Sequence, residues 1–253
     1  MNTNDKGASV TVNNVTKTFP SPDGTDIPFT ALDGVSFDLE SGSCTLIAGA
    51  NGSGKSVLMG IIAGLDKADS GSASVFCGGK PAHAGLVFQE AETQLLGETP
   101  LEDVLFGLRN SGVNRAEAEQ SARSMLAQAG LAGKELSPAR FLSGGEKRRL
   151  AVAGILALDV KLIIFDEPYA NLDYAGVKQV NALIRMLREN GRTIIILTHE
   201  LEKSLALCDR FIILYHGKKV FDGTPGEGLK EPLETWDIRY PLVSYTKKDD
   251  LVW

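Results

Sequence analysis

The fold of this chain is most clearly indicated by eight consecutive residues, Gly49-Ala50-Asn51-Gly52-Ser53-Gly54-Lys55-Ser56, which match the pattern GxxxxGK[ST] at every fixed position. The apolar residues 44–48 before them are typical of a strand, and the apolar residues 57–63 after them are typical of a helix. Glycines let backbone amides approach phosphate oxygens that a Cβ would block, and the start of a helix favours an anion. We therefore expect a phosphate-binding loop, in which Lys55 reaches the β- and γ-phosphates of a nucleotide and Ser56 binds Mg²⁺.

The bulk composition is that of an ordinary globular protein. The 253 residues carry a net charge of −6, which argues against a nucleic-acid binder that relies on bulk charge. No uninterrupted apolar run is long enough to span a bilayer, and the first residues lack the apolar stretch of a signal peptide. Three widely spaced cysteines without a Cys-x-x-Cys pair are typical of reduced thiols in a cytosolic protein.

The order of hydrophobic patterns predicts an α/β core interrupted by helices. Alternating residues near the N-terminus indicate half-buried strands, and about 98–158 has the texture of helices. The apolar runs 162–165 and 193–197, with a helical pattern over about 174–190 between them, are typical of parallel strands buried on both faces. Residues 223–253 are rich in glycine, proline and charge, and we expect them to wrap the surface in a role that the sequence does not assign.

Two further segments suggest phosphate chemistry. Asp166 and Glu167 end a buried apolar run, so Asp166 can hold Mg²⁺ through water while Glu167 polarises the water that attacks the γ-phosphate. The sequence Ser143-Gly144-Gly145 before a helix makes a second amide-rich anion site. A single nucleotide can hardly contact both of these sites within one monomer. We therefore expect two chains to pair head to tail, each covering the nucleotide of the other.

These segments occur in the order found in ATP-binding cassette (ABC) ATPases, which the chain resembles over about residues 8–224. They are similar to the Walker A loop, Q-loop, signature, Walker B strand, D-loop and switch histidine of that family. In this sequence the six segments are Gly49–Ser56, Gln89, Leu142–Glu146, Ile163–Pro168, Ala170–Asp173 and His199.

The resemblance implies a P-loop NTPase core with a mostly parallel sheet, an N-terminal antiparallel β region and an inserted α-helical subdomain. The single ABC domain would span 8–224, with its core at 8–89 and 159–224, its helical subdomain at about 90–158, and a tail at 225–253.

The resemblance also implies ATP and Mg²⁺ as cofactors and gives each residue a role. Glu167 would be the catalytic base, His199 would clamp the γ-phosphate, and Gln89 would contact Mg²⁺ and the attacking water. Ser56, Gln89 and Asp166 would support the metal, while Ser143 and Gly145 would act on the nucleotide of the partner and Asp173 would link the two sites. The full nucleotide-binding set would be Phe19, Gly49, Ala50, Asn51, Gly52, Ser53, Gly54, Lys55, Ser56, Val57, Ser143, Gly144, Gly145 and Asp173.

Three assignments leave an alternative open. Phe19 would stack on adenine, but its place rests on distance along the chain alone, and a core aromatic fits as well. The basic run Lys147-Arg148-Arg149 could indicate nucleic acid, yet its apolar flanks favour a solvated helix face. His83 and His216 match no motif and are expected at the surface or in turns.

Residues 90–107 and 147–154 resemble the energy-coupling-factor (ECF) and cobalt-type importer ATPases. That resemblance implies uptake of a vitamin or metal ion at the cytoplasmic face of the membrane. The partners would be a like or related ATPase, a transmembrane coupling subunit docked on about 90–107, and a small substrate-binding membrane subunit, with no nucleic acid. The alternatives are the ATPase of another ABC transporter class, or a soluble ABC ATPase acting in translation or DNA repair.

Overall fold

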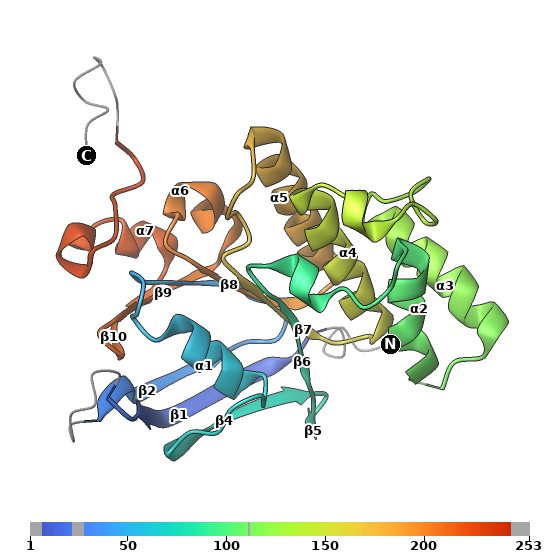
Figure 1. The fold of residues 1–253 in the computed structure, drawn as a ribbon. Coiled ribbons are helices and arrows are strands. Elements are labelled where there is room, and N and C mark those ends of the chain that lie inside the picture. The colour runs from blue at the N-terminus through green and yellow to red at the C-terminus, as the bar shows by residue number, and fades with distance from the viewer. Residues whose placement is uncertain (1–6, 22–27, 111, 244–253) are drawn as a thin grey trace.

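Two β-sheets and a group of helices make up the computed structural model, which describes residues 7–21, 28–110 and 112–243 (Figure 1). The first sheet is antiparallel, with the order β2-β1-β4-β5. The alternating valines of β1 place every second side chain against helix α1 and the other sheet, as half-buried strands require. The elements of this region are β1 (Ser9–Phe19), β2 (Phe29–Leu39), α1 (Lys55–Ile62), β4 (Ser70–Cys77) and β5 (Lys80–Pro81).

The second sheet positions the site. Its order is β10-β9-β3-β8-β7-β6, and all neighbouring pairs except β10 with β9 are parallel. Strands β3 and β8 are buried along their whole length, which fits their continuous apolar sequences. The six strands are β3 (Cys44–Ala48), β6 (Ala84–Val87), β7 (Leu162–Asp166), β8 (Thr193–Thr198), β9 (Arg210–Tyr215) and β10 (Lys218–Gly223).

A helical part lies between β6 and β7 in the chain and projects to one side of the sheets (Figure 1). Its helices share a hydrophobic cluster of their own, which includes Val104, Leu126 and Leu150. Asn114 caps α3 by accepting a hydrogen bond from the Glu117 amide, as its sequence predicts. The elements are η2 (Ala91–Gln94), α2 (Pro100–Asn110), α3 (Arg115–Gln128), η3 (Ala139–Phe141) and α4 (Gly144–Ala157).

The remaining helices cover the outer face of the second sheet. Leu233 and Ile238 belong to the buried cluster beneath α5, so this stretch after 224 contributes to the core as well as to the surface. None of the helices in the described part of the chain has the length and apolar character that a membrane crossing requires. These elements are α5 (Tyr174–Glu189), α6 (Leu201–Ser204), η4 (Leu205–Leu207), α7 (Pro225–Gly228) and η5 (Leu233–Trp236).

The architecture confirms the predicted fold class, with a mostly parallel sheet, an antiparallel N-terminal sheet and inserted helices. The exact bounds of the two subdomains and of the tail stay a prediction. His83 and His216 are exposed, and His216 lies in the turn between β9 and β10 with φ 46°.

Candidate nucleotide-binding site

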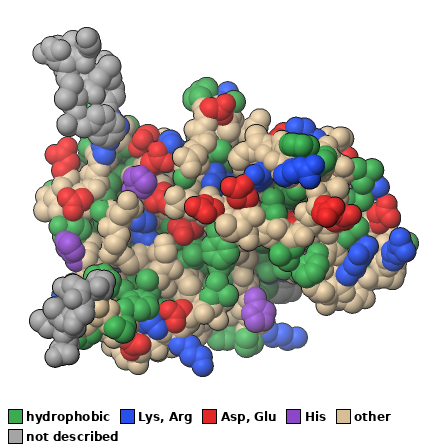
Figure 2. Space-filling view, viewed as in Figure 1, with side chains coloured by type: hydrophobic (Ala, Val, Ile, Leu, Met, Phe, Trp, Pro, Cys, Tyr) green, Lys and Arg blue, Asp and Glu red, His purple; other side chains and the backbone are tan. Residues whose placement is uncertain are grey.

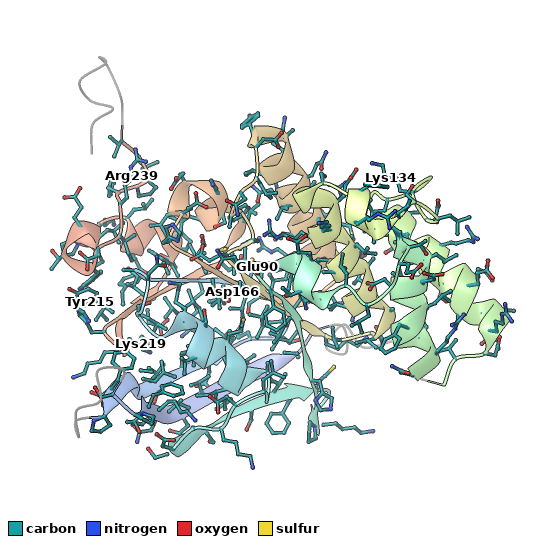
Figure 3. All side chains as sticks on the ribbon, viewed as in Figure 1. Glu90, Lys134, Asp166, Tyr215, Lys219 and Arg239 are labelled. Carbon is teal, nitrogen blue, oxygen red and sulfur yellow. The ribbon has the colours of Figure 1, made fainter. Side chains whose placement is uncertain are left out.

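The candidate site lies where the parallel strands of the second sheet end. Because β3, β6, β7 and β8 run in the same direction, the residues that follow them meet along one edge. One hollow at this edge is lined by Asn51–Val57 after β3, Gln89 after β6, and Asp166 and Glu167 at the end of β7. Figure 3 labels Asp166 near the centre of the molecule, between α1 and the helical part. The fold thus assembles groups that are far apart in the sequence.

The glycines of the loop are required by its geometry. Gly54 has a φ of 100°, and a Cβ there would lie 2.4 Å from the carbonyl oxygen of Ala31. A Cβ on Gly49 would lie 2.4 Å from the carbonyl oxygen of Leu214. Gly54 also caps α1 without a side-chain hydrogen bond, so the first amides of that helix have no acceptor within it. The loop is therefore a cradle of amides suited to an anion.

Lys55 is buried beside this cradle, with only 6% of its surface exposed. Its ammonium donates to the carbonyl oxygens of Gly49 at 2.7 Å and Ala50 at 3.1 Å. Burial lowers the pKa of Lys55, while the charges of Glu167 and Asp166 act to raise it. A cation held against carbonyls in this way gains stronger acceptors when phosphate oxygens enter the loop.

Ser56 and Asp166 form the second part of the hollow. The Ser56 hydroxyl donates to Oδ2 of Asp166 at 3.3 Å. Burial raises the pKa of Asp166, with a further increase from Glu167, and the hydrogen bond from Ser56 opposes the shift. A hydroxyl and a carboxylate side by side are oxygen ligands of the kind that Mg²⁺ prefers.

The site suits Mg²⁺ only together with a phosphate ligand. Across the residues that the structure describes, no three His, Cys, Asp or Glu side chains are grouped as a metal site. A Mg²⁺ ion at Ser56 and Asp166 would therefore complete its coordination with water and phosphate oxygens, as this ion does in nucleotide sites. The donor set and the amide cradle fit the predicted metal and nucleotide.

Glu167 is held by Thr198, the last residue of β8, and by His199, which follows it. Its Oε2 accepts a hydrogen bond from the Thr198 hydroxyl at 2.9 Å, and its Oε1 lies 2.9 Å from Nδ1 of His199. Glu167 is 8% exposed and has a φ of 44°, a conformation that is costly for a residue with a side chain. Sequence analysis assigned Glu167 and His199 to one site but missed Thr198, whose only signal is its position before His199.

Ser143, Gly144 and Gly145 do not line the hollow of the phosphate loop. They line a separate hollow together with Asp173 at the start of α5. The Ser143 hydroxyl accepts a hydrogen bond from the Glu146 amide at 3.3 Å, and the Glu146 carboxylate accepts one from the Ser143 amide at 2.9 Å. Asp173 caps α5 by accepting from the Gly176 amide at 2.7 Å. One chain thus has two candidate anion surfaces with no lining residue in common.

The aromatic residue that lines the phosphate-loop hollow is Phe29, which sequence analysis missed. Phe19 is the partner of Phe29 across strands β1 and β2, and its ring lies 5.3 Å from the ammonium of Lys17. Phe19 is 37% exposed and Phe29 is 49% exposed, so the alternative of a core aromatic is wrong for Phe19. Phe29 could have been found only from its pairing with Phe19, and that pairing requires knowledge of the register of β1 and β2.

The interpretation of Lys147-Arg148-Arg149 as a solvated helix face is wrong for its two arginines. Arg148 is 4% exposed and Arg149 is 9% exposed, whereas Lys147 forms an ion pair with Glu92. The arginines are buried because α4 is covered by neighbouring elements on most sides, which its helical periodicity could not reveal. Acidic and basic side chains are interspersed on the face drawn in Figure 2, without a basic stripe.

Comparisons with known proteins agree with this fold. A family profile described as "ABC transporter" matches residues 32–170. The energy-coupling factor transporter ATP-binding protein EcfA of Methanocaldococcus jannaschii is 34% identical, over 92% of this chain and 88% of its own length.

Two solved structures share the fold. The structure of cbiO1 from Clostridium perfringens, described as part of the ABC transporter complex cbiONQ, has a TM-score of 0.76 at 31% identity. The match covers 92% of this chain and 95% of that protein. A dimeric ATP-binding cassette in a post-hydrolysis state, bound to ADP and Pi, has a TM-score of 0.74 at 27% identity and covers 85% of this chain and 98% of its own.

Proposed function

Because the chain belongs to the ABC transporter family and is an ABC-type ATPase of the ECF and cobalt-type group, we propose that it drives uptake of a vitamin or metal ion through partner membrane subunits. The observation that carries this proposal is the single hollow that joins Lys55, Asp166 and Glu167 to the amide cradle of the phosphate loop. This hollow combines groups that can bind phosphate with a carboxylate that can act as a base. The similarity to transporter ATP-binding proteins is what suggests a role in transport.

Binding of ATP is assigned to the loop and its neighbours. The amides of residues 51–57 and the ammonium of Lys55 neutralise the phosphates, and the exposed ring of Phe29 or Phe19 stacks on adenine. When Mg²⁺ is bound, it neutralises charge on the β- and γ-phosphates. Ser56, Asp166 and Gln89 would hold the ion.

Hydrolysis is assigned to Glu167. Its carboxylate accepts a proton from the water that attacks the γ-phosphate, and Thr198 keeps one of its oxygens in place. His199, which is half-exposed, is free to turn from Glu167 toward a γ-phosphate and donate a hydrogen bond to it. Gln89 lines the same hollow and orients the water.

The active form is proposed to be a head-to-tail dimer. Ser143, Gly144 and Gly145 line a hollow that shares no residue with the phosphate loop, so they are available to the nucleotide of a second chain. Asp173 lines the same hollow and links the two sites. The dimeric state of the similar ATP-binding cassette with ADP and Pi supports the pairing of two chains. A like chain and a related ATPase satisfy it equally.

Residues about 90–107 are proposed as the docking surface for a transmembrane coupling subunit at the cytoplasmic face of the membrane. Leu96 is 69% exposed, whereas Leu101 and Val104 are buried in the helical part. The exposed acids Glu90, Glu92, Glu98 and Glu102 lie along the same segment. An apolar side chain among acids fits a short helix that bears arginine.

Asp103 is an exception among these acids. Its Oδ1 accepts hydrogen bonds from the Leu96 and Gly97 amides at 2.6 Å and 3.0 Å, so it braces the segment from within. Burial raises the pKa of Asp103, and these two amides oppose the shift. Asp103 therefore supports the segment from within and is not one of its exposed acids.

Two measurements test the proposal. The purified chain should hydrolyse ATP in the presence of Mg²⁺. The variant Lys55→Ala should bind ATP more weakly, and not merely hydrolyse it more slowly, because it lacks the cation of the cradle. Glu98→Lys should weaken co-purification with the coupling subunit while leaving ATPase activity unchanged. Glu102→Lys should act likewise but also weakens the start of α2, since Glu102 accepts from the Thr99 amide at 3.2 Å.

The matched control is Glu119→Lys, which reverses an exposed acid on α3 whose ion pair with Arg123 lies at the surface. Full assembly and transport after reversal of both Glu98 and Glu102 would place the docking surface elsewhere.

A further inference from the structure

Arg148 connects three elements that surround the candidate site. It extends from α4 in the helical part, and its Nη2 donates to the carbonyl oxygen of Gln89 at 2.7 Å. Its Nη1 reaches the carbonyl oxygen of Ala170 at 3.5 Å. Gln89 belongs to the loop after β6, and Ala170 follows Glu167 after β7. The Ala170 amide in turn donates to the Glu167 carbonyl at 3.2 Å. One guanidinium therefore contacts both loops that carry Gln89 and Glu167.

The surroundings of Arg148 are unfavourable for a charge. The side chain is 4% exposed and its Nε has no hydrogen-bond partner. Among the described residues, no carboxylate forms an ion pair with it, and burial lowers its pKa with no opposing charge. Burying an unpaired cation costs free energy that two carbonyls offset only in part. A methionine of similar length would fill this position at lower cost, so packing alone gives no reason for arginine here.

We propose that Arg148 is a positioning residue for ATP hydrolysis, holding the loops of Gln89 and Glu167 against α4. Its planar fork of donors suits two carbonyls that come from different loops. Arg148 also lines a hollow with Gln89, Ala170 and Asn171, and of these residues only Gln89 also lines the hollow of the phosphate loop, so Arg148 acts through these loops and not on the nucleotide. The inference rests on the roles proposed for Gln89 and Glu167.

The same contacts give the helical part a way to influence hydrolysis. A movement of α4 changes the distance from Arg148 to Gln89 and Ala170 together, because both carbonyls are bound by one side chain. A displacement of about 1 Å at a catalytic group can lower the rate by about 100-fold. The position of α4 would thus set the hydrolysis rate through Arg148.

Arg148→Met tests the proposal in the full-length protein, because it keeps the side-chain length and removes both hydrogen bonds. We expect kcat to fall about tenfold or more while KM for ATP changes less than about twofold. Amides of residues 89–92 and 170–172 should exchange hydrogen faster, with Tm unchanged or higher. Arg148→Lys retains a donor for one carbonyl and should recover part of kcat.

The matched control is Arg188→Met on α5. Arg188 also donates to a backbone carbonyl, that of Leu207 at 2.9 Å, and it lines neither hollow of the site. This variant should keep the kcat of the unmodified protein. If Arg148→Met does not fold, Arg148→Gln and Arg148→Lys give the same readouts.

The possible outcomes distinguish a failure of this inference from a failure of the proposed function. A wild-type kcat and unchanged exchange in Arg148→Met would overturn the inference, and so would a loss of kcat that merely follows a general loss of stability. Glu167→Gln serves as the reference in the same assay. If hydrolysis persists in Glu167→Gln, the proposed function fails; if it is lost there while Arg148→Met is fully active, only this inference fails.

Discussion

Helices α1 and α4 both begin at glycine-rich sequences, and their first turns are exposed in different ways. Gly54 caps α1 without any side-chain hydrogen bond, so the amides of that turn are left to a ligand. Ser143 and Glu146 cap α4 with reciprocal hydrogen bonds, so that only the Gly144 and Gly145 amides of its first turn are left to a ligand. Helix α4 therefore caps its own first turn, whereas the first amides of α1 have no such partner and are suited to an anion.

The charged side chains around the two helix starts also differ, and again the start of α1 is the one better suited to bind an anion. Lys55 is buried at α1 and Asp166 is half-buried, and the charges of both interact with that of one carboxylate base, Glu167. At α4, the Ser143 side chain is exposed and the Glu146 carboxylate is paired with Lys134. These differences support the proposal that the start of α1 holds a phosphate of the chain's own nucleotide and that the start of α4 makes a contact that forms and breaks.

The strongest test of this contrast is Glu167→Gln. The amide keeps the shape and the hydrogen bond from Thr198 but cannot accept a proton from water. Turnover should fall by roughly 10²- to 10⁴-fold, while ATP binding persists and the dimer with bound ATP accumulates. Steady-state hydrolysis and size-exclusion chromatography with ATP measure both effects. Near-normal turnover in the purified variant would remove Glu167 from the role of base.

The second test asks whether the start of α4 serves another chain. Ser143→Ala and Lys55→Ala should each be poorly active, and a mixture should recover part of the activity because a mixed dimer has one intact composite site. Ser143→Ala also removes a helix cap worth about 1 kcal/mol, so its Tm must be measured alongside. No recovery, with mixed dimers shown to form, counts against sharing between chains.

The third test compares a glycine at each helix start. Gly54→Ala places a Cβ 2.4 Å from the Ala31 carbonyl oxygen at a φ of 100°, so we expect a loss of stability on the order of 2–4 kcal/mol. Gly144→Ala meets no atom within 4 Å and should leave stability unchanged or raise it by up to about 1 kcal/mol.

If a partner's phosphate approaches Gly144 closely, Gly144→Ala should lose turnover in spite of its stability. Denaturant unfolding and ATPase rates on the same preparations decide this. Full activity in Gly144→Ala would mean that no phosphate comes within contact of that backbone.

The sequence predicted the α1 side of the contrast far better than the α4 side. Gly49–Ser56 could be interpreted because the strand, loop and helix are local, and each residue type has a single chemical reason to be there. Asp166 followed from its position at the end of an apolar run, and His199 from the resemblance to ABC ATPases. Thr198 and Phe29 could not be found in this way, because each contact depends on the register or order of strands.

The burial of Arg148 was beyond the sequence for a different reason. The periodicity of α4 shows which faces are apolar, but it does not show that neighbouring loops cover the remaining face. Leu233 and Ile238 illustrate the same limit, since a stretch rich in charge and glycine gave no sign of core residues. Tertiary cover of a polar face is set by the whole fold.

The smallest expected effect comes from two carboxyl groups whose pKa values are shifted in opposite directions, and which therefore change the stability in opposite senses as the pH falls. Burial raises the pKa of Asp166 above its usual value, so at neutral pH the folded state carries an unfavourable charge that is relieved as pH falls. The hydrogen bond from Lys134 lowers the pKa of Glu146, followed in size by that from the Ser143 amide. Glu146 therefore adds stability above its unfolded pKa that is lost as pH falls through its folded pKa.

Asp166→Asn should consequently raise Tm at pH 8 by on the order of one or two degrees, and Glu146→Gln should lower it. The Asp166→Asn difference should shrink first as the pH falls, because the folded pKa of Asp166 is raised, and the Glu146→Gln difference should persist to lower pH, because the folded pKa of Glu146 is lowered. Thermal unfolding from pH 8 to pH 4, without nucleotide, measures the two slopes. If Asp166→Asn is less stable than the unmodified protein at pH 8, then Lys55 stabilises the Asp166 charge more than burial opposes it. The start of α1 would in that case be a balanced ion cluster and not a site held at a cost in stability for its ligand.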